Sequence, residues 1–461
     1  MRNFIGSKDF YIRVLKVMLP IIIQQGITNF VGLLDNIMVG QVGTEQMSGV
    51  AIANQLQFVF QLCVFGALAG AGIFCAQYYG RGDQETVRSV FRYKVWVSLL
   101  ITLCGIGVFW FFRAPLIRLF LTERGAGDLD ATLGYGVEYL RIMLVGMVPF
   151  AVVQLYASTM RETGETTIPM RAGIVAVLVN MAGNYILIFG HFGAPRMGVA
   201  GAAVATTVSR FVELAIVLIY ARRKQERFPY FAGIYRTLRV PAALAKEITV
   251  KGMPLLLNEL LWSLGITVLF QCYSTRGLIA VAAFNISNTV SNFFSIAMFA
   301  MGSAISILVG QELGAGEFER AKDTNRKMTV FGFFLCLAAA GLLALGAPLF
   351  PRIYNTTEEV RTLANQLLWM DAVFLAPRSL YNSCYFTLRS GGKTLITFLF
   401  DSVSMWVVSI PAAMVLAHLT ATPLLAIYLI IQCLDVLKTA AGLLLVYRGI
   451  WINNLTVSQG R

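Results

Sequence analysis

Long apolar runs, separated by short polar segments, follow one another along nearly the whole chain. Most are at least as long as the roughly 20 residues that an α-helix needs to cross a bilayer. The pattern therefore predicts an all-α polytopic membrane protein with about twelve transmembrane helices. The expected spans are 11–39, 46–79, 93–113, 136–160, 170–190, 197–220, 250–274, 280–313, 327–350, 362–388, 395–418 and 420–447.

One polar segment, 221–250, is longer than the others and divides the chain nearly in half. It predicts a cytoplasmic linker with a surface helix, whose charges are solvated or face lipid headgroups. We therefore expect an N-lobe at 1–220 with helices 1–6 and a C-lobe at 251–450 with helices 7–12. A cytoplasmic tail at 451–461 completes the expected organisation.

The two halves of the chain resemble each other. Pro20 and Pro254 are 234 positions apart, and the same shift aligns AQYYGRGD at 76–83 with GQELGAGE at 310–317. Because each half has an even number of spans, the repeats are parallel and related by an axis along the membrane normal. This symmetry predicts a transporter with a substrate cavity between two six-helix lobes.

Charged residues make up only 13% of the chain, about half the share that is typical of soluble domains. The net charge of +13 comes from Lys and Arg residues that gather in the linker and on alternate loops. This bias predicts a multi-pass protein of the inner or plasma membrane with both termini in the cytoplasm. The basic surplus is thus explained by topology, and no nucleic-acid binding is expected. The basic start lacks a cleavage-site pattern, so we expect no cleaved signal peptide.

Three acids fall well inside predicted spans with no adjacent cation: Asp35, Glu259 and Asp371. Acids within a membrane usually face a watery cavity and mark an ion or substrate path. A buried carboxylate can take up and release protons, or it can coordinate Na⁺ or attract a lipophilic cation. The residues alone leave these alternatives open. Asp401 and Asp435 lie nearer the cytoplasmic ends of their spans, where we expect them to cap a helix or to form an ion pair.

Polar residues in the fifth and sixth spans are spaced to lie on single helix faces. Asn180 and Asn184 are four positions apart, and so are Ala202 and Thr206. Together with Asp35, these side chains offer a carboxylate, two amide oxygens and a hydroxyl, a set that suits a small cation. Polar groups also join helices that are rich in small residues. Spacing alone favours neither interpretation.

Several motifs resemble the multidrug and toxic-compound extrusion (MATE) family, in its NorM-like branch. They are LLDNIMVGQVG, AQYYGRGD, RETGETTIP, NYILIFG, GVAGAAVAT, MPLLLNE, VGQELGAGE and LRSGGKT. They occur in the family's order and cover essentially the whole chain. The resemblance implies twelve helices in two six-helix lobes that form a V.

The resemblance also assigns roles to residues of this chain. Asp35 matches the family's first-helix acid, Asn180 its fifth-helix amide and Thr206 its sixth-helix hydroxyl, which are the possible Na⁺ ligands. Asn184 stands where some members have an acid, so the N-lobe site carries less negative charge. Glu259 and Asp371 match the C-lobe acids of the NorM-like branch.

These observations predict a secondary active efflux transporter that exchanges lipophilic organic cations for Na⁺ or H⁺ by alternating access. The alternative is a flippase-type exporter of lipid-linked or polar substrates with a related fold. An exporter of that kind would need a strongly basic cavity, whereas the intramembrane charges identified here are mostly acids. We expect a monomer in a lipid bilayer that has no enzymatic activity, since no metal cluster or nucleophile–base pairing is recognisable. No cofactor is expected apart from the coupling ion.

Overall fold

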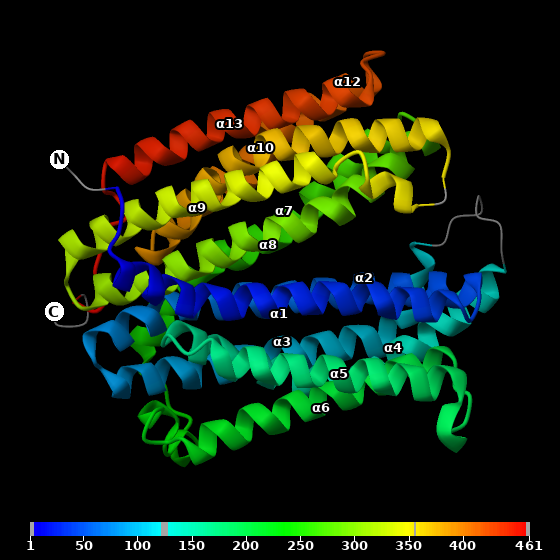
Figure 1. The fold of residues 1–461 in the computed structure, drawn as a ribbon. Coiled ribbons are helices and arrows are strands. Elements are labelled where there is room, and N and C mark those ends of the chain that lie inside the picture. The colour runs from blue at the N-terminus through cyan, green and yellow to red at the C-terminus, as the bar shows by residue number, and fades with distance from the viewer. Residues whose placement is uncertain (1–3, 121–127, 355, 458–461) are drawn as a thin grey trace. The chain divides into compact units, whose positions relative to one another are not determined.

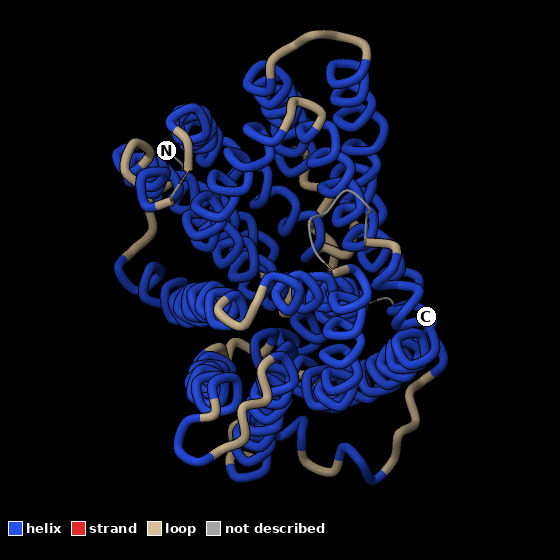
Figure 2. The backbone as a smooth tube through the Cα atoms, turned by 90° about the vertical axis from the view of Figure 1, so that its right-hand side faces the viewer, coloured by secondary structure: helices blue, strands red, loops and turns tan. Residues whose placement is uncertain are grey.

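The computed structural model describes residues 4–120, 128–354 and 356–457. Every regular element in these ranges is a helix (Figure 2), so the predicted all-α class is confirmed. The elements are labelled in Figure 1. In chain order they are α1 (Lys8–Gly40), α2 (Thr44–Arg81), α3 (Gln84–Arg118), α4 (Leu129–Glu162), α5 (Thr167–Phe189), η1 (His191–Gly193), α6 (Val199–Arg223), η2 (Pro229–Phe231), η3 (Ile234–Arg236), α7 (Ala242–Ser274), α8 (Leu278–Gly314), α9 (Phe318–Gly346), η4 (Phe350–Ile353), α10 (Glu358–Ser390), α11 (Thr394–Phe398), η5 (Leu399–Val403), η6 (Met405–Ser409), α12 (Ile410–His418) and α13 (Leu424–Tyr447).

Eleven helical segments in the described ranges are long and apolar enough to cross a membrane. One of them, Thr394–His418, combines α11, the two π-helical turns η5 and η6, and α12. The remaining long helix, α10, has 33 residues but is more polar than its neighbours. With α10 included, the helices agree with the expected number of about twelve.

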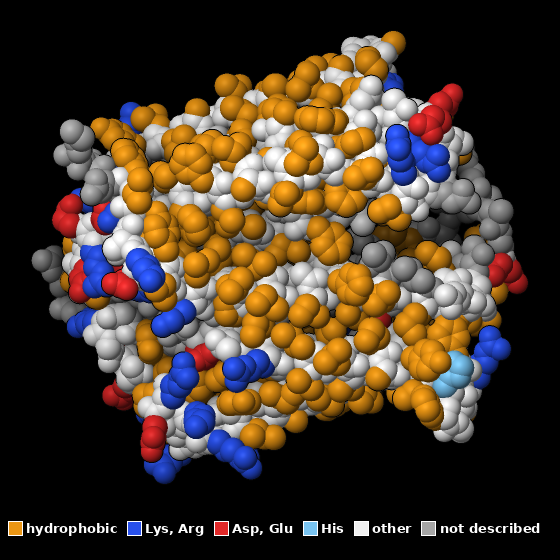
Figure 3. Space-filling model, in the orientation of Figure 1, with side chains coloured by type: hydrophobic (Ala, Val, Ile, Leu, Met, Phe, Trp, Pro, Cys, Tyr) orange, Lys and Arg blue, Asp and Glu red, His pale blue; other side chains and the backbone are white. Residues whose placement is uncertain are grey.

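The flanks of the long helices expose many large apolar side chains. Leu100, Phe111 and Leu345 are 63%, 76% and 76% exposed, respectively. On the face drawn in Figure 3, apolar side chains cover the middle of the helices, and most Lys and Arg side chains gather near the helix ends. Extensive apolar exposure is unusual for a soluble monomer, and contact with lipid explains it.

The chain folds as two compact units. The N-terminal unit comprises Ile23–Cys75 and Gln84–Thr249. The C-terminal unit comprises Met1–Ile22, Ala76–Asp83 and Val250–Arg461. The division within α1 falls just after its internal proline, where the missing N–H interrupts the helical hydrogen bonds.

The linker between α6 and α7 differs from the prediction. In place of a separate surface helix it has two 3₁₀ turns, η2 and η3, and α7 begins at Ala242, before position 250. Tyr230 and Ile234 are buried, so the segment is more than a solvated connection. Its backbone carbonyls accept hydrogen bonds from Arg88 and Arg92, one turn apart on α3. The linker is therefore fixed along α3, an arrangement that its polar composition does not reveal.

In the C-terminal unit, the ends of α2 and α8 meet at two glycines. A Cβ atom on Gly80 would lie 1.9 Å from the Gln311 carbonyl oxygen, and one on Gly314 would lie 1.8 Å from the Gln77 carbonyl oxygen. No larger residue fits at either position without a shift of the backbone. The 234-residue shift relates Gly80 to Gly314 and Gln77 to Gln311. Each repeat therefore uses the equivalent glycine to let α2 and α8 approach closely.

The described part of the expected tail, 451–457, packs into this unit. Trp451 and Leu455 are each 2% exposed. The Leu455 backbone N–H donates to Gln77 Oε1 at 2.7 Å, and Gln77 Nε2 donates to the Asn453 carbonyl oxygen at 3.2 Å. The end of the chain thus holds the last turns of α2 in place.

Candidate functional site

The candidate site in the N-terminal unit depends on a close contact between α5 and α6. A Cβ atom on Gly183 would lie 2.9 Å from the Ala205 Cβ, and one on Gly201 would lie 2.6 Å from the Leu187 carbonyl oxygen. Small residues at such contacts let two helix backbones approach closely. The approach places the polar face of α5 against that of α6.

Asp35 of α1 is held from α5. Asn184 Nδ2 donates to Asp35 Oδ1 at 2.6 Å. Asn180, one turn earlier, lies between Asp35 and Thr206. The orientation that satisfies both neighbours places its amide nitrogen 3.0 Å from Asp35 Oδ2 and its oxygen 3.0 Å from Thr206 Oγ1. The structure therefore brings together the four N-lobe residues that the spacing singled out.

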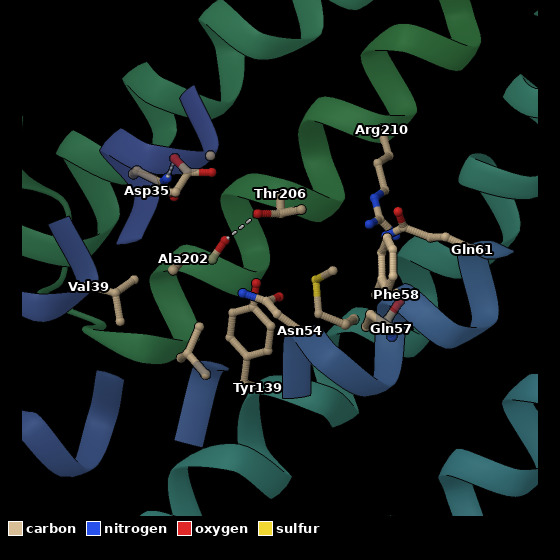
Figure 4. Close-up of a pocket in the computed structure, with 14 residues that line it drawn as sticks. Asp35, Val39, Asn54, Gln57, Phe58, Gln61, Tyr139, Ala202, Thr206 and Arg210 are labelled. Carbon is tan, nitrogen blue, oxygen red and sulfur yellow. Dashed lines mark hydrogen bonds between the residues drawn. The ribbon is translucent and has the colours of Figure 1, made fainter. Parts of the chain in front are cut away.

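Three of these residues, Asp35, Asn184 and Thr206, line a cavity of about 290 Å³ within the N-terminal unit. Figure 4 shows Asp35 and Arg210 on opposite sides of the view, with Thr206, Ala202 and Asn54 between them. Tyr139, from α4, contacts Asn54 and Thr206 through its hydroxyl. The lining comprises Gly32, Asp35, Val39, Val50, Asn54, Gln57, Phe58, Gln61, Tyr139, Met143, Asn184, Ala202, Thr206 and Arg210.

Sequence reasoning missed Arg210, although a signal for it was present. Arg210 continues the four-residue spacing of Ala202 and Thr206 on α6, so all three lie on one face of the helix. Its Nη1 donates to the Gly146 carbonyl oxygen at 3.2 Å, and its guanidinium lies 5.1 Å from the Phe150 ring centroid. The cavity therefore contains a cation as well as the acid that was predicted.

Asp371, on α10 of the C-terminal unit, is 4% exposed. Its Oδ2 accepts hydrogen bonds from the hydroxyls of Ser291 at 2.6 Å and Ser287 at 3.0 Å. Its Oδ1 accepts from the Tyr428 hydroxyl at 2.6 Å and from Arg378 Nη2 at 3.0 Å. The expectation that Asp371 has no adjacent cation is wrong, because Arg378 lies on the same face of α10 two turns later.

Asp401 was expected to cap a helix or to form an ion pair, and this prediction is wrong. The structure buries it within η5, where it accepts from Asn258 Nδ2 at 2.8 Å and from the Tyr381 hydroxyl. The two π-helical turns end just before Pro411, whose ring and missing N–H disturb the hydrogen bonds of the preceding turn. Such turns are frequent at functional sites.

Glu259 lies in a different environment from Asp371. It lies within electrostatic range of Arg389 and Asp401, and neither residue is a described partner of Asp371. The two C-lobe acids expected from the sequence are therefore not joined by any described contact. Each belongs to its own polar cluster.

Comparison with known proteins gives a consistent result. The family model described as MatE matches residues 20–186 and 254–415, which are two matches whose starts differ by the repeat shift. The chain is 28% identical over 460 residues to the probable multidrug resistance protein NorM of Thermotoga maritima, covering 97% of this chain and 94% of that protein. It is 25% identical over 433 residues to the probable multidrug resistance protein YoeA of Bacillus subtilis, covering 92% and 90%.

Solved structures show the same fold. A D35N mutant of the Vibrio cholerae MATE transporter VcmN superposes with a TM-score of 0.86 at 18% identity, covering 97% of this chain and 98% of that one. An outward-facing multidrug resistance MATE family transporter superposes with a TM-score of 0.83 at 19% identity, covering 94% of each chain. The family matches span most of both halves, and this multi-pass membrane protein belongs to the MatE family of multidrug efflux transporters.

Proposed function

We propose that this protein is an antiporter that exports lipophilic organic cations in exchange for a coupling ion, with Asp35 as the residue that both compete for. Two six-helix lobes, residues 1–220 and 251–450, would open the cavity alternately to each side of the membrane. Both termini would lie in the cytoplasm, as the basic loops indicate. One observation carries the proposal: Asp35 is the only carboxylate among the residues described as lining the cavity.

Competition at one carboxylate is sufficient for exchange. Asp35 forms no ion pair with a described residue, and its hydrogen-bond partners Asn184 and Asn180 are neutral amides. In its ionised form it attracts a cationic substrate, and when it binds the coupling ion this attraction is lost. Linkage requires that each ligand weaken the binding of the other to the same extent. Exchange then follows if the lobes change access only with one ligand bound.

The orientation of the amides favours H⁺ over Na⁺ as the coupling ion. Asn184 donates to Asp35, and the Asn180 orientation that satisfies both of its neighbours also turns its nitrogen toward Asp35, whereas a Na⁺ site needs the amide oxygens. A proton needs only one acceptor, and Asn184 Oδ1 has no hydrogen-bond partner among the described residues. Rotation of the Asn184 amide would let this oxygen accept from protonated Asp35. We therefore propose protonation of Asp35, accompanied by a change in the contact between α1 and α5.

Asp371 and Glu259 have a different role in this proposal. Asp371 already accepts four hydrogen bonds, one of them from Arg378, so it exchanges ligands less readily than Asp35. We propose that the C-lobe acids stabilise one arrangement of α7, α8 and α10 during the transport cycle. The N-lobe acid would bind the coupling ion.

The test is transport in inside-out vesicles that contain the purified protein. Accumulation of ethidium, a lipophilic cation, is measured with a proton gradient alone and then with a Na⁺ gradient alone. We expect an acidic lumen to drive accumulation and Asp35→Asn to abolish it. Accumulation driven only by Na⁺ would refute the preference for H⁺, and unchanged accumulation by Asp35→Asn would refute the role of Asp35.

Asp435→Asn is the matched control. Asp435 also lies on a transmembrane helix, α13, and it pairs with Lys438 at 2.8 Å as the sequence predicted. It does not line the cavity. This variant should retain gradient-driven accumulation. If only Asp35→Asn loses it, the loss is not a general effect of removing an acid from a span.

A further inference from the structure

Arg210 occupies the part of the cavity lining that lies away from Asp35 (Figure 4). It lies four positions after Thr206 on α6, and its guanidinium extends toward α2 and α4. Only one of its N–H groups has a described hydrogen-bond acceptor, the Gly146 carbonyl oxygen at 3.2 Å. A guanidinium offers five donors. Arg210 therefore has donors left for a ligand in the cavity.

The charge of Arg210 is only partly compensated. Glu213, one turn later on α6, lies within electrostatic range of Arg210 and also of Arg161 from α4. Glu213 is the carboxylate within electrostatic range of Arg210 among the described residues, and Arg210 shares it with Arg161, which also has Glu162 nearby. No ion pair joins Arg210 to Asp35 among the described residues. Tyr139 lies within electrostatic range of both.

A second feature of the lining also indicates a polar ligand. Gln57 of α2 is 1% exposed, and neither its Nε2 nor its Oε1 has a hydrogen-bond partner among the described residues. Buried amides are almost always hydrogen-bonded, so an unpartnered one needs an explanation. Gln57 and Gln61 line the same side of the cavity as Arg210 in Figure 4. An oxyanion there would accept from both the Gln57 amide and the guanidinium.

The opposite end of the cavity has the complementary chemistry. Asp35 is an anion, and Asn184 Oδ1 beside it is a buried acceptor without a described partner. Protonated amines donate hydrogen bonds to such groups. The cavity therefore has an acceptor end at Asp35 and a donor end at Arg210, with the Tyr139 and Thr206 hydroxyls between them.

We propose that Arg210 is a specificity-determining residue that binds the carboxylate of zwitterionic substrates whose cationic group binds at Asp35. This inference rests on the proposed export function and refines its substrate class from simple cations to compounds that carry both charges. Guanidinium–carboxylate pairs combine charge with directional hydrogen bonds. A purely cationic substrate would leave Gln57 and the free donors of Arg210 unsatisfied, and it would bind more weakly.

The test uses two dyes that differ in a single charge. Rhodamine 110 carries a free carboxylate beside its cationic ring system, and rhodamine 123 is its methyl ester, which has only the positive charge. Binding of each dye to the purified protein in nanodiscs is measured by fluorescence anisotropy, and export of each is measured in vesicles. The wild-type protein should bind rhodamine 110 more tightly than the ester.

Arg210→Gln should weaken the binding of rhodamine 110 by roughly ten- to a hundredfold, the range expected for the loss of a hydrogen bond between charged groups. Binding of the ester should change little. Arg210→Lys keeps the charge and should retain part of the preference for rhodamine 110 over the ester. If Arg210 acted only by packing against Phe150, both Arg210→Gln and Arg210→Lys would lose that contribution. Glu213→Gln removes the compensating acid and should strengthen the binding of rhodamine 110.

Arg276→Gln is the matched control for loss of an arginine. Arg276 donates to the carbonyl oxygens of Thr422 and Leu416 at 2.8 Å each, in the C-terminal unit and outside the cavity. The Arg276→Gln variant should leave the ratio of the two dye affinities unchanged. Thermal unfolding of each variant in detergent identifies any that fail to fold.

Each outcome leads to a definite conclusion. If the wild-type protein binds both dyes equally, or if Arg210→Gln weakens both to the same extent, the inference is wrong. If the dyes bind with the expected preference but no gradient drives their export, the proposed function fails and the assignment of Arg210 stands. If export occurs without a carboxylate preference, the proposed function stands and the inference fails.

Discussion

Asp35 and Asp371 are both carboxylates within transmembrane helices, yet the two units surround them differently. Asp371 is nearly inaccessible and accepts four hydrogen bonds, one of them from Arg378. Asp35 lies at a cavity and is contacted by two neutral amides. A fully satisfied, charge-paired acid favours one arrangement of its helices, whereas an acid held by neutral donors can exchange one cation for another. Duplication kept the helices of the two repeats but not their chemistry, since the repeat shift places Leu269 opposite Asp35.

The comparison predicts effects on the free energy of unfolding, and the largest is expected for Arg378→Gln. The change leaves Asp371 buried without its cation, so the protein should be destabilised by about 3–5 kcal/mol. Thermal unfolding in detergent measures the effect. The double variant with Asp371→Asn should recover part of the loss, because no unpaired charge remains. If the double variant is no more stable than Arg378→Gln, Asp371 is not charge-compensated as described.

Ser291→Ala tests whether α8 contributes to holding Asp371. The substitution removes a 2.6 Å hydrogen bond to a buried carboxylate, and we expect a loss of about 1.5–3 kcal/mol. Ser303→Ala is a suitable control, since that hydroxyl, on the same helix, donates to the Phe299 carbonyl oxygen of its own helix and contacts no carboxylate among the described residues. Equal unfolding temperatures for the two variants would contradict the importance of this contact.

Gly201→Ala tests the helix contact beneath the N-terminal site. The added methyl group would lie 2.6 Å from a carbonyl oxygen of α5, so α6 must move away from Asn184. Overpacking of this kind costs about 1–3 kcal/mol, and proton-driven export should fall with it. Gly107→Ala is the matched control, because a Cβ there meets no atom within 4 Å. Comparable unfolding and transport by the two glycine variants would contradict the role of this contact.

Asp35→Asn should have the smallest effect on stability, about 1 kcal/mol or less, because an amide oxygen can still accept the Asn184 hydrogen bond. Asp371→Asn should destabilise the protein more, since four donors then lose a charged acceptor. Both variants are compared by thermal unfolding and by proton-driven ethidium accumulation. The contrast between the two acids fails if Asp35→Asn is the less stable variant.

Much of the fold could be predicted because span length and hydropathy depend only on local sequence. The expected spans agree with the helices to within a few residues at many ends, but α3, α4, α7 and α9 begin well before the expected positions 93, 136, 250 and 327. The convergence of Asn180 and Asn184 on Asp35 could also be predicted from helical spacing and family resemblance together. Arg378 was missed although it follows Asp371 by seven positions on α10, a spacing that puts both on the same helix face. A helix brings residues seven positions apart together, whereas the linear sequence shows only adjacent neighbours.

The sequence by itself determined the approximate number and position of the helices, the repeat and the acids within the spans, because the bilayer requires each spanning segment to be long and apolar. Only the tertiary structure decided which acid has a cation partner and which amide has no described hydrogen-bond partner. It also decided that the linker and residues 451–457 are packed against the helices. These properties depend on contacts between residues far apart in the chain. A carboxylate such as Asp35 or Asp371 has the same chemistry in either unit, and its role follows from the donors that the fold places around it.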